Sequence, residues 1–181
     1  MAHLDFPFGK TALGLDIADT RLRAVLTSGL HAYTPEGDGE TLVRRAMADP
    51  IGTKPLAELA RGKQRVVIIA SDHTRPVPSK VIIPQMLAEV RRGNPAADIT
   101  ILIATGCHRE TTRDELVAKF GEDIVQNEKI YVHDCDDAAM LTDIGVLPSG
   151  GACIVNRLAA EADLLLAEGF IEPHFFAGYS G

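Results

Sequence analysis

The sequence predicts an α/β fold: a parallel Rossmann-like sheet covered by helices, with an N-terminal β-hairpin annex. Two observations support this prediction. Apolar, β-branched runs that are typical of buried strands recur about every thirty residues from position 65 onward. Stretches with the apolar spacing of helices lie between these runs, and this alternation is typical of a parallel sheet covered by helices.

The composition is that of a globular chain with a core of its own. Its 181 residues are 46% hydrophobic, which suits one domain with a short annex. The net charge is −7 without any basic run, so we expect neither nucleic acid nor an anionic membrane surface as a partner. The first residues lack a signal-peptide pattern, and no apolar run is long enough to span a membrane. Cys107, Cys135 and Cys153 show no zinc-type spacing, which favours a reduced, cytoplasmic location.

The first third of the chain predicts the annex. Residues 10–17 alternate between apolar and polar side chains, and residues 21–26 follow after a short Asp-Thr turn, so these segments are expected to form a hairpin. Residues 40–48 and 55–60 have the apolar spacing of short helices. We therefore expect residues 1–62 to form a hairpin with short helices packing on it, and residues 63–181 to form the Rossmann-like core.

The rest of the chain supplies the predicted sheet and its helices. A helix is expected from Ser79 to Arg92, and a second one after Thr112, which has capping-box spacing to Glu115 and precedes a stop at Gly121. Residues 141–155 resemble a hairpin, after which Asn156 is expected to cap a short helix. The four expected strands are residues 65–70, 98–104, 129–133 and 163–167.

Chemically active side chains follow each of these strands. Because ligands bind outside the carboxyl ends of the strands in an open parallel sheet, the side chains are expected to share one crevice. Four of the six histidines fall in or beside these segments, whereas His3 and His31 do not. The segments are Asp72–Arg75, Thr105–Thr111, His133–Asp136 and Glu168–Gly181.

The residue types indicate proton transfer and anion binding. His108 and His174 have glycine neighbours that allow a ligand to approach, and imidazoles exchange protons near neutral pH. Arg75 suits a carboxylate or a phosphate, with Asp72 as its orienting partner.

Other readings of these segments stay open. His73 and His133 can equally be hydrogen-bonded loop residues, and residues 133–136 can be a metal site or, as we favour, a solvated turn. Cys107 beside His108 is a weak candidate for the nucleophile of a hydrolase.

Three stretches, in this order and spacing, resemble the nickel-pincer lactate racemase family. The stretches are Asp72–Pro78, Ala104–Arg109 and Glu172–Gly181. The resemblance also includes Asn156–Leu158 and covers the N-terminal domain of that family, which corresponds to essentially all of residues 1–181.

The resemblance implies an isomerase that racemises a 2-hydroxy acid such as lactate. The implied cofactor is nickel pyridinium-3,5-bisthiocarboxylate mononucleotide, a pincer tethered to a lysine, which accepts a hydride from the substrate and returns it to either face. His108 and His174 would be the alternating general acid and base, and Arg75 with Asp72 would bind the substrate. The implied cofactor-binding residues are Asp72, His73, Thr74, Arg75, Gly178, Tyr179, Ser180 and Gly181.

The chain departs from the family pattern at its end. In the family, the tethering lysine, a nickel-binding histidine and a C-terminal domain lie beyond the position of Gly181. We therefore expect no metal ligand within this chain, the cofactor only in a longer protein, and an inactive isolated chain. Cofactor-biosynthesis proteins would be partners of the longer protein. The alternative from another class is a non-catalytic module that binds a nucleotide or a phosphate through Arg75.

Overall fold

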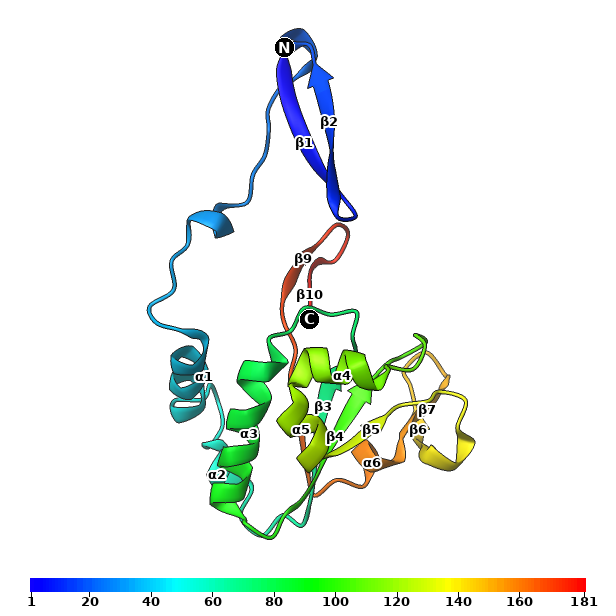
Figure 1. Ribbon diagram of the computed structural model, residues 1–181. Helices are drawn as coiled ribbons and strands as arrows, with labels where there is room; N and C mark the ends of the chain where they lie inside the picture. Colours follow the sequence, from blue (N-terminus) through cyan, green and yellow to red (C-terminus); the bar gives the residue numbers. More distant parts are fainter. The chain divides into compact units, whose positions relative to one another are not determined.

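The structure is a computed structural model that describes residues 1–181, apart from the side chain of His31 (Figure 1). The chain forms two compact units, Met1–Glu36 and Gly37–Gly181.

The first unit is a β-hairpin followed by irregular chain. Strands β1 (Ala2–Phe8) and β2 (Thr11–Ile17) pair antiparallel across the turn at Gly9 and Lys10. Gly9 has a φ of +59°, a conformation that glycine adopts without strain and that suits a two-residue hairpin turn. The hairpin is confirmed, but the predicted pairing of residues 10–17 with 21–26 is wrong, because this turn pairs β2 with the segment before it. Two short 3₁₀ helices follow, η1 (Asp19–Arg21) and η2 (Gly29–Ala32).

The second unit begins with two helices that pack against a third. Helices α1 (Gly39–Ala48) and α2 (Leu56–Leu59) both contact α3 (Ser79–Gly93). The compact units divide after Glu36, so both helices lie in the second unit and not with the hairpin in a segment of residues 1–62. Met47 and Leu56 pack against the core of the second unit, which explains why these helices belong to it.

Four parallel strands form the central sheet of the second unit. The strands are β3 (Arg65–Ser71), β4 (Asp98–Ala104), β5 (Lys129–Val132) and β8 (Leu164–Ala167), in the spatial order β5-β4-β3-β8. The chain adds β4 and β5 on one side of β3 and then returns to place β8 on the other side. This reversal makes the carboxyl ends of the paired strands β3 and β8 a topological switch point.

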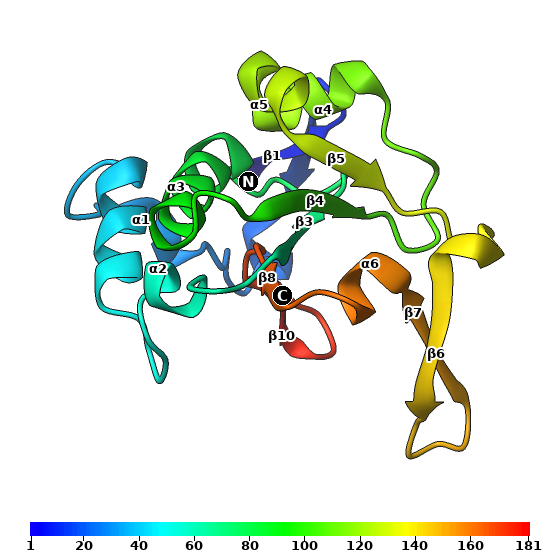
Figure 2. The same cartoon turned by 90° about the horizontal axis from the view of Figure 1, so that it is seen from below.

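The core lies between the sheet and three helices. Alternate residues of β3 and β4 (Ile68 and Ile101 among them, both 0% exposed) face α3, α4 (Arg113–Phe120) and α5 (Glu122–Asn127). Figure 2 shows these helices on one side of the sheet and α6 (Arg157–Ala160) on the other. The α/β fold with a parallel, helix-covered sheet and an N-terminal hairpin is therefore confirmed.

Local signals in the sequence placed several element boundaries. Thr112 and Glu115 form the expected capping box of α4, which ends at Gly121. Strands β6 (Leu141–Val146) and β7 (Ala152–Asn156) form the expected hairpin after η3 (Ala138–Met140), and Asn156 caps α6. The chain ends in a small hairpin of β9 (Glu172–His174) and β10 (Gly178–Ser180). In the described part of the chain, no helix has both the length and the apolar character needed to cross a membrane.

Candidate functional site

A cavity of about 440 Å³ lies at the carboxyl ends of β3 and β8, at the switch point of the sheet. It is formed by the segments that follow β3, β4 and β8, together with the end of the β9–β10 hairpin. Its charged and polar lining residues are Ser71, Asp72, Arg75, Thr105, Cys107, His108, Glu168, Glu172 and Ser180. The structure thus brings together the predicted residues Asp72, Arg75, His108, Ser180 and Gly181.

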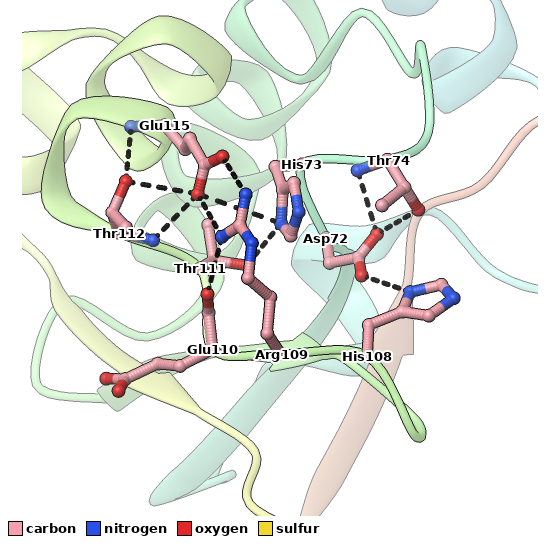
Figure 3. Close-up of polar contacts among 9 residues, drawn as sticks. All are labelled: Asp72, His73, Thr74, His108, Arg109, Glu110, Thr111, Thr112 and Glu115. Atoms are coloured by element: carbon pink, nitrogen blue, oxygen red, sulfur yellow. Dashed lines mark hydrogen bonds and ion pairs between the residues drawn. The ribbon is translucent and has the colours of Figure 1, made fainter.

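Asp72 and His108 form a hydrogen-bonded pair at this cavity (Figure 3). The distance from His108 Nδ1 to Asp72 Oδ2 is 2.6 Å. The other carboxylate oxygen of Asp72 accepts hydrogen bonds from the backbone N–H of Thr74 at 3.0 Å and from its hydroxyl at 2.6 Å. Asp72 is 2% exposed, whereas the side chain of His108 is 48% exposed. The buried carboxylate therefore holds an imidazole that a ligand can reach.

The backbone explains how residues from two strands meet. Asp72 directly follows β3, and the turn Thr105–His108 follows β4, the neighbouring strand. The His108 N–H donates to the Thr105 carbonyl at 2.9 Å, and Gly106 supplies the positive φ of +58° that the turn requires. The turn carries His108 back across the sheet edge toward Asp72.

The hydrogen bonds around Asp72 keep it ionised. Burial raises the pKa of this carboxyl, but the hydrogen bonds from Thr74 and His108 lower it by more in sum, so its pKa lies below the ordinary value. An ionised Asp72 accepts the Nδ1–H of His108 and leaves Nε2 to exchange a proton with a ligand.

Arg75 lines the same cavity but does not pair with Asp72. Its Nη1 donates weakly to the Thr74 hydroxyl at 3.4 Å, and its backbone carbonyl accepts a hydrogen bond from Lys119 Nζ at 3.0 Å. The side chain is exposed. The expectation that Asp72 orients Arg75 is therefore wrong, because Thr74 and His108 occupy the Asp72 carboxylate.

His73 points away from the Asp72–His108 pair (Figure 3). Its Nδ1 lies 3.1 Å from the hydroxyl of buried Thr111, and Glu115 lies 3.9 Å away. Arg109 forms a bidentate ion pair with Glu115. This ion pair and the hydrogen bond from the Thr112 N–H both lower the pKa of the Glu115 carboxyl. This network anchors the start of α4. The structure gives His73 a hydrogen-bonded loop position, and its cofactor role stays a prediction.

The β9–β10 hairpin carries the remaining predicted residues. His174 Nδ1 accepts a hydrogen bond from the Ala177 N–H at 3.2 Å, and its ring contacts Phe175 and Phe176. Among the residues that the structure describes, Ser180 and Gly181 contribute from this hairpin to the cavity lining, as does Glu172, while His174, Gly178 and Tyr179 do not. The catalytic role of His174 stays a prediction.

The other candidates lie in different surroundings. Cys107 lines the cavity as an exposed free thiol. His133 Nδ1 lies 3.1 Å from Asn156 Nδ2, on the apolar pocket beside α6. Asp134, Cys135 and Asp136 are exposed, and their ligand atoms lie within 4.8 Å of one another. This arrangement is compatible with a metal site and with a solvated turn, so the choice between them stays a prediction. The side chain of His31 lies outside the described part of the chain.

Comparison with known proteins identifies the family. The family model of the lactate racemase N-terminal domain matches residues 8–181. The chain belongs to this family. A lactate racemase from Thermoanaerobacterium thermosaccharolyticum is 53% identical over 181 residues, which are 100% of this chain and 42% of that protein. A lactate racemase from Lactiplantibacillus plantarum is 50% identical, over 100% of this chain and 43% of that protein.

A solved structure agrees with this assignment. The lactate racemase apoprotein from Thermoanaerobacterium thermosaccharolyticum matches with a TM-score of 0.89 at 52% identity, over 99% of this chain and 42% of that one. The chain thus spans less than half the length of the relatives that it matches.

Sequence reasoning assigned no role to three polar residues at this site. Glu168 follows β8 and lines the cavity, Ser71 ends β3 and also lines it, and Ser79 starts α3 and hydrogen-bonds Glu168 at 2.6 Å. The signal for Glu168 was its position directly after a predicted strand, the same signal that identified Asp72. Ser71 and Ser79 carried no signal of their own, because serine is common at strand ends and at helix starts.

Proposed function

We propose that this chain forms the N-terminal catalytic part of a racemase that acts on a 2-hydroxy acid such as lactate. The observation that carries the proposal is the Asp72–His108 pair, which lines a cavity shared with the guanidinium of Arg75. Two relatives that match the whole chain are named lactate racemase, which supports the same substrate class.

Each side chain has a distinct task in this proposal. Arg75 binds the substrate carboxylate, for which a guanidinium offers paired donors. His108 exchanges a proton with the substrate hydroxyl through Nε2, while Asp72 holds the ring through Nδ1. His174 performs the same exchange for the opposite enantiomer. The proposed racemase needs two such groups, because the two enantiomers present opposite faces of the reacting carbon.

The proposal includes a nickel pyridinium-3,5-bisthiocarboxylate mononucleotide as cofactor. Hydrogen on carbon is too weakly acidic for an imidazole alone, and the bound cofactor would supply the hydride acceptor. The cavity fits a nucleotide in two respects: Arg75 offers a cation, and two buried polar atoms, Ser71 Oγ and Glu168 Oε2, lack a hydrogen-bond partner among the described residues. We propose that residues 72–75 and 178–181 contact the cofactor, and we assign no nickel ligand to this chain.

The roles of the two histidines are tested by substitution in the full-length protein. We expect His108→Ala and His174→Ala each to slow the interconversion of L- and D-lactate by at least about 100-fold, because each removes a proton-transfer group. His3→Ala, which removes an exposed imidazole of the β1–β2 hairpin, is the control and should leave the rate unchanged. Unchanged rates in the first two variants would contradict the assignment.

A second candidate function is a non-catalytic nucleotide- or phosphate-binding module, which the exposed Arg75 at the cavity favours. Calorimetry with nicotinic acid mononucleotide separates the two. Binding that disappears in Arg75→Ala, in a full-length protein without racemase activity, would support this candidate. Under the main proposal, residues 1–181 alone are inactive, because they span less than half of the named racemases.

The cellular setting completes the proposal. Cys107, Cys135 and Cys153 are all free thiols, which suits a reduced cytoplasm. We propose cofactor-biosynthesis proteins as partners of the full-length protein. The isolation of the protein with its cofactor from a cytoplasmic fraction is the direct check.

A further inference from the structure

Lys119 lies near the end of α4 and reaches the segment that connects β3 to α3. Its Nζ donates a hydrogen bond to the backbone carbonyl of Arg75 at 3.0 Å. The next residue, Phe120, is 2% exposed in the core, so the turn of α4 that carries Lys119 is held in place. A fixed helix therefore contacts the backbone of a residue that lines the candidate site.

This contact influences the direction in which the Arg75 side chain leaves the backbone. The peptide unit between Arg75 and Pro76 is planar, so a donor that holds the carbonyl oxygen also orients this plane. A proline restricts the preceding residue mainly to extended conformations, which leaves Arg75 little freedom to turn relative to the plane. On the other side of Arg75, its N–H donates to the Asp72 carbonyl at 3.3 Å. The direction of its Cα–Cβ bond thus depends on the hydrogen bond from Lys119.

The guanidinium of Arg75 has no comparably firm contact. Among the residues that the structure describes, its hydrogen bond is the weak donation from Nη1 to the Thr74 hydroxyl at 3.4 Å, and the side chain is exposed. A long side chain of this kind populates several rotamers, and ordering it on binding costs free energy. The backbone contact with Lys119 limits the space in which the guanidinium moves before a ligand arrives.

Lys119 does not itself line the cavity of the candidate site. It lines a neighbouring hollow of about 450 Å³ next to the starts of α3 and α4, whereas Arg75 lines both. A ligand in the cavity would contact Arg75 and not Lys119. Lys119 therefore acts on such a ligand by contact only through Arg75.

We propose that Lys119 is a positioning residue that presents the guanidinium of Arg75 to the carboxylate of the substrate. This inference rests on the proposed function, in which Arg75 binds that carboxylate, and it adds a residue outside the cavity. A hydrogen bond from an ammonium group is stronger than one between neutral groups, so its loss should be measurable as weaker ligand binding.

Calorimetry on the full-length protein with its cofactor bound tests the positioning role. The probe is 2-hydroxy-2-methylpropanoate, which has the carboxylate and the hydroxyl of lactate but no hydrogen on C2, so it does not react. In Lys119→Met, which keeps an unbranched side chain of good helix propensity, we expect the dissociation constant to rise about tenfold. Lys119→Arg retains a charged donor and should stay within about twofold of the unchanged protein.

Two further single variants serve as controls. Lys119→Gln is a second neutral variant with a shorter side chain, and it should show the same loss of binding if Lys119→Met is unstable. Lys54→Met removes an exposed lysine that precedes α2, and it should leave the dissociation constant unchanged.

The variant Arg75→Ala separates positioning from other effects of Lys119. Alone, it should weaken binding of the probe at least as much as Lys119→Met does. The double variant with Lys119→Met and Arg75→Ala should bind no more weakly than Arg75→Ala, because the group that Lys119 positions is absent. A direct effect of the Lys119 charge on the ligand, or a general loosening of the fold, would instead weaken the double variant further.

The outcomes separate this inference from the proposed function. If Lys119→Met binds the probe like the unchanged protein while Arg75→Ala does not, the positioning role is refuted and the role of Arg75 stands. A further loss of about tenfold in the double variant also refutes it. If Arg75→Ala binds as well as the unchanged protein, both roles are refuted. The racemase proposal is judged separately, by the lactate interconversion rate of the His108 and His174 variants.

Discussion

At the scale of single residues, the site depends on a buried carboxylate that serves an exposed imidazole. One carboxylate oxygen of Asp72 accepts hydrogen bonds from Thr74, and the other accepts a hydrogen bond from His108. A carboxylate held in this way fixes the orientation of the ring and the nitrogen that carries its proton. In the proposed reaction, Asp72 is thus a positioning residue for His108.

The variant Asp72→Asn tests this relation. Asparagine has nearly the same shape but no charge, and its amide group can face Nδ1 with a donor in place of an acceptor. We expect the lactate interconversion rate of the full-length protein to fall about 100-fold, with a smaller change in KM. Asp72→Glu should recover part of the rate, which a purely structural role would not explain. A rate equal to that of the unchanged protein would contradict the role.

The sequence predicted the location of several candidate residues more readily than their hydrogen-bond partners. The order of strands and loops was enough to place Asp72, Arg75 and His108 at one edge of the sheet. The choice of His108 over Arg75 as the partner of Asp72 depends on the turn at Gly106, whose course a residue pattern does not describe. The position of Glu168 after a strand was predictable, but its hydrogen bond to Ser79 was not, because the two residues are distant in sequence.

Among the helices, α2 and α3 approach each other more closely at Gly93 than any side chain at that position would allow. Gly93 is the last residue of α3, and a Cβ atom built there would lie 2.1 Å from the Ala57 carbonyl oxygen. Ala57 itself is 5% exposed, so the backbone of α2 has little room to retreat. Only glycine fits at this contact.

The variant Gly93→Ala is therefore expected to destabilise the protein. Although alanine is the better helix former, the clash with the α2 backbone should lower the free energy of unfolding by about 1–3 kcal/mol. Thermal or urea denaturation measures the change. The matched control is Gly29→Ala, where a Cβ atom would meet nothing within 4 Å. A stability of Gly93→Ala equal to or above that of the parent would refute the close packing.

Element boundaries were predictable where a local signal specified them. The capping box at Thr112 and Glu115 predicted the start of α4, and Gly121 predicted its end. The N-terminal hairpin was paired wrongly because residues 21–26 also have a strand-like composition. Composition alone does not decide which segment pairs with β2, whereas the two-residue turn at Gly9 does.

At the scale of the second unit, the topology of the sheet explains the location of the site. The chain reverses its direction of strand addition between β3 and β8, so the loops that follow these strands diverge and leave a crevice. Two acids lie there, the buried Asp72 after β3 and the half-buried Glu168 after β8. The cavity thus follows from the order β5-β4-β3-β8, and the loops supply its chemistry.

Carboxyl groups with shifted pKa values make the stability of the protein depend on pH. The pKa of Asp163 lies below its ordinary value because the backbone N–H groups of Arg65 and Gln64 donate to it, and the carboxyl groups of Glu115 and Asp72 also have lowered pKa values. As the pH falls, such groups take up protons in the unfolded chain before they do so in the folded chain. The stability that they contribute above about pH 4–5 is therefore lost as the pH falls further. Glu168, with a raised pKa, acts in the opposite direction, since its ionisation on raising the pH favours the unfolded chain.

Asp38 and Glu122 also have lowered pKa values, so five lowered carboxyl pKa values oppose the raised one of Glu168. The net expectation is a melting temperature that decreases steadily as the pH falls from about 5 to 3. Melting curves across this range measure it. Asp163→Asn should lower the melting temperature at pH 7 and flatten its dependence on pH, because the amide keeps an acceptor for the N–H groups of Gln64 and Arg65 but has no charge to lose. Asp49→Asn, at the exposed end of α1, is the control and should leave the slope unchanged. A melting temperature that rises on acidification would show that burial of Glu168 outweighs the hydrogen bonds that hold Asp72, Glu115 and Asp163.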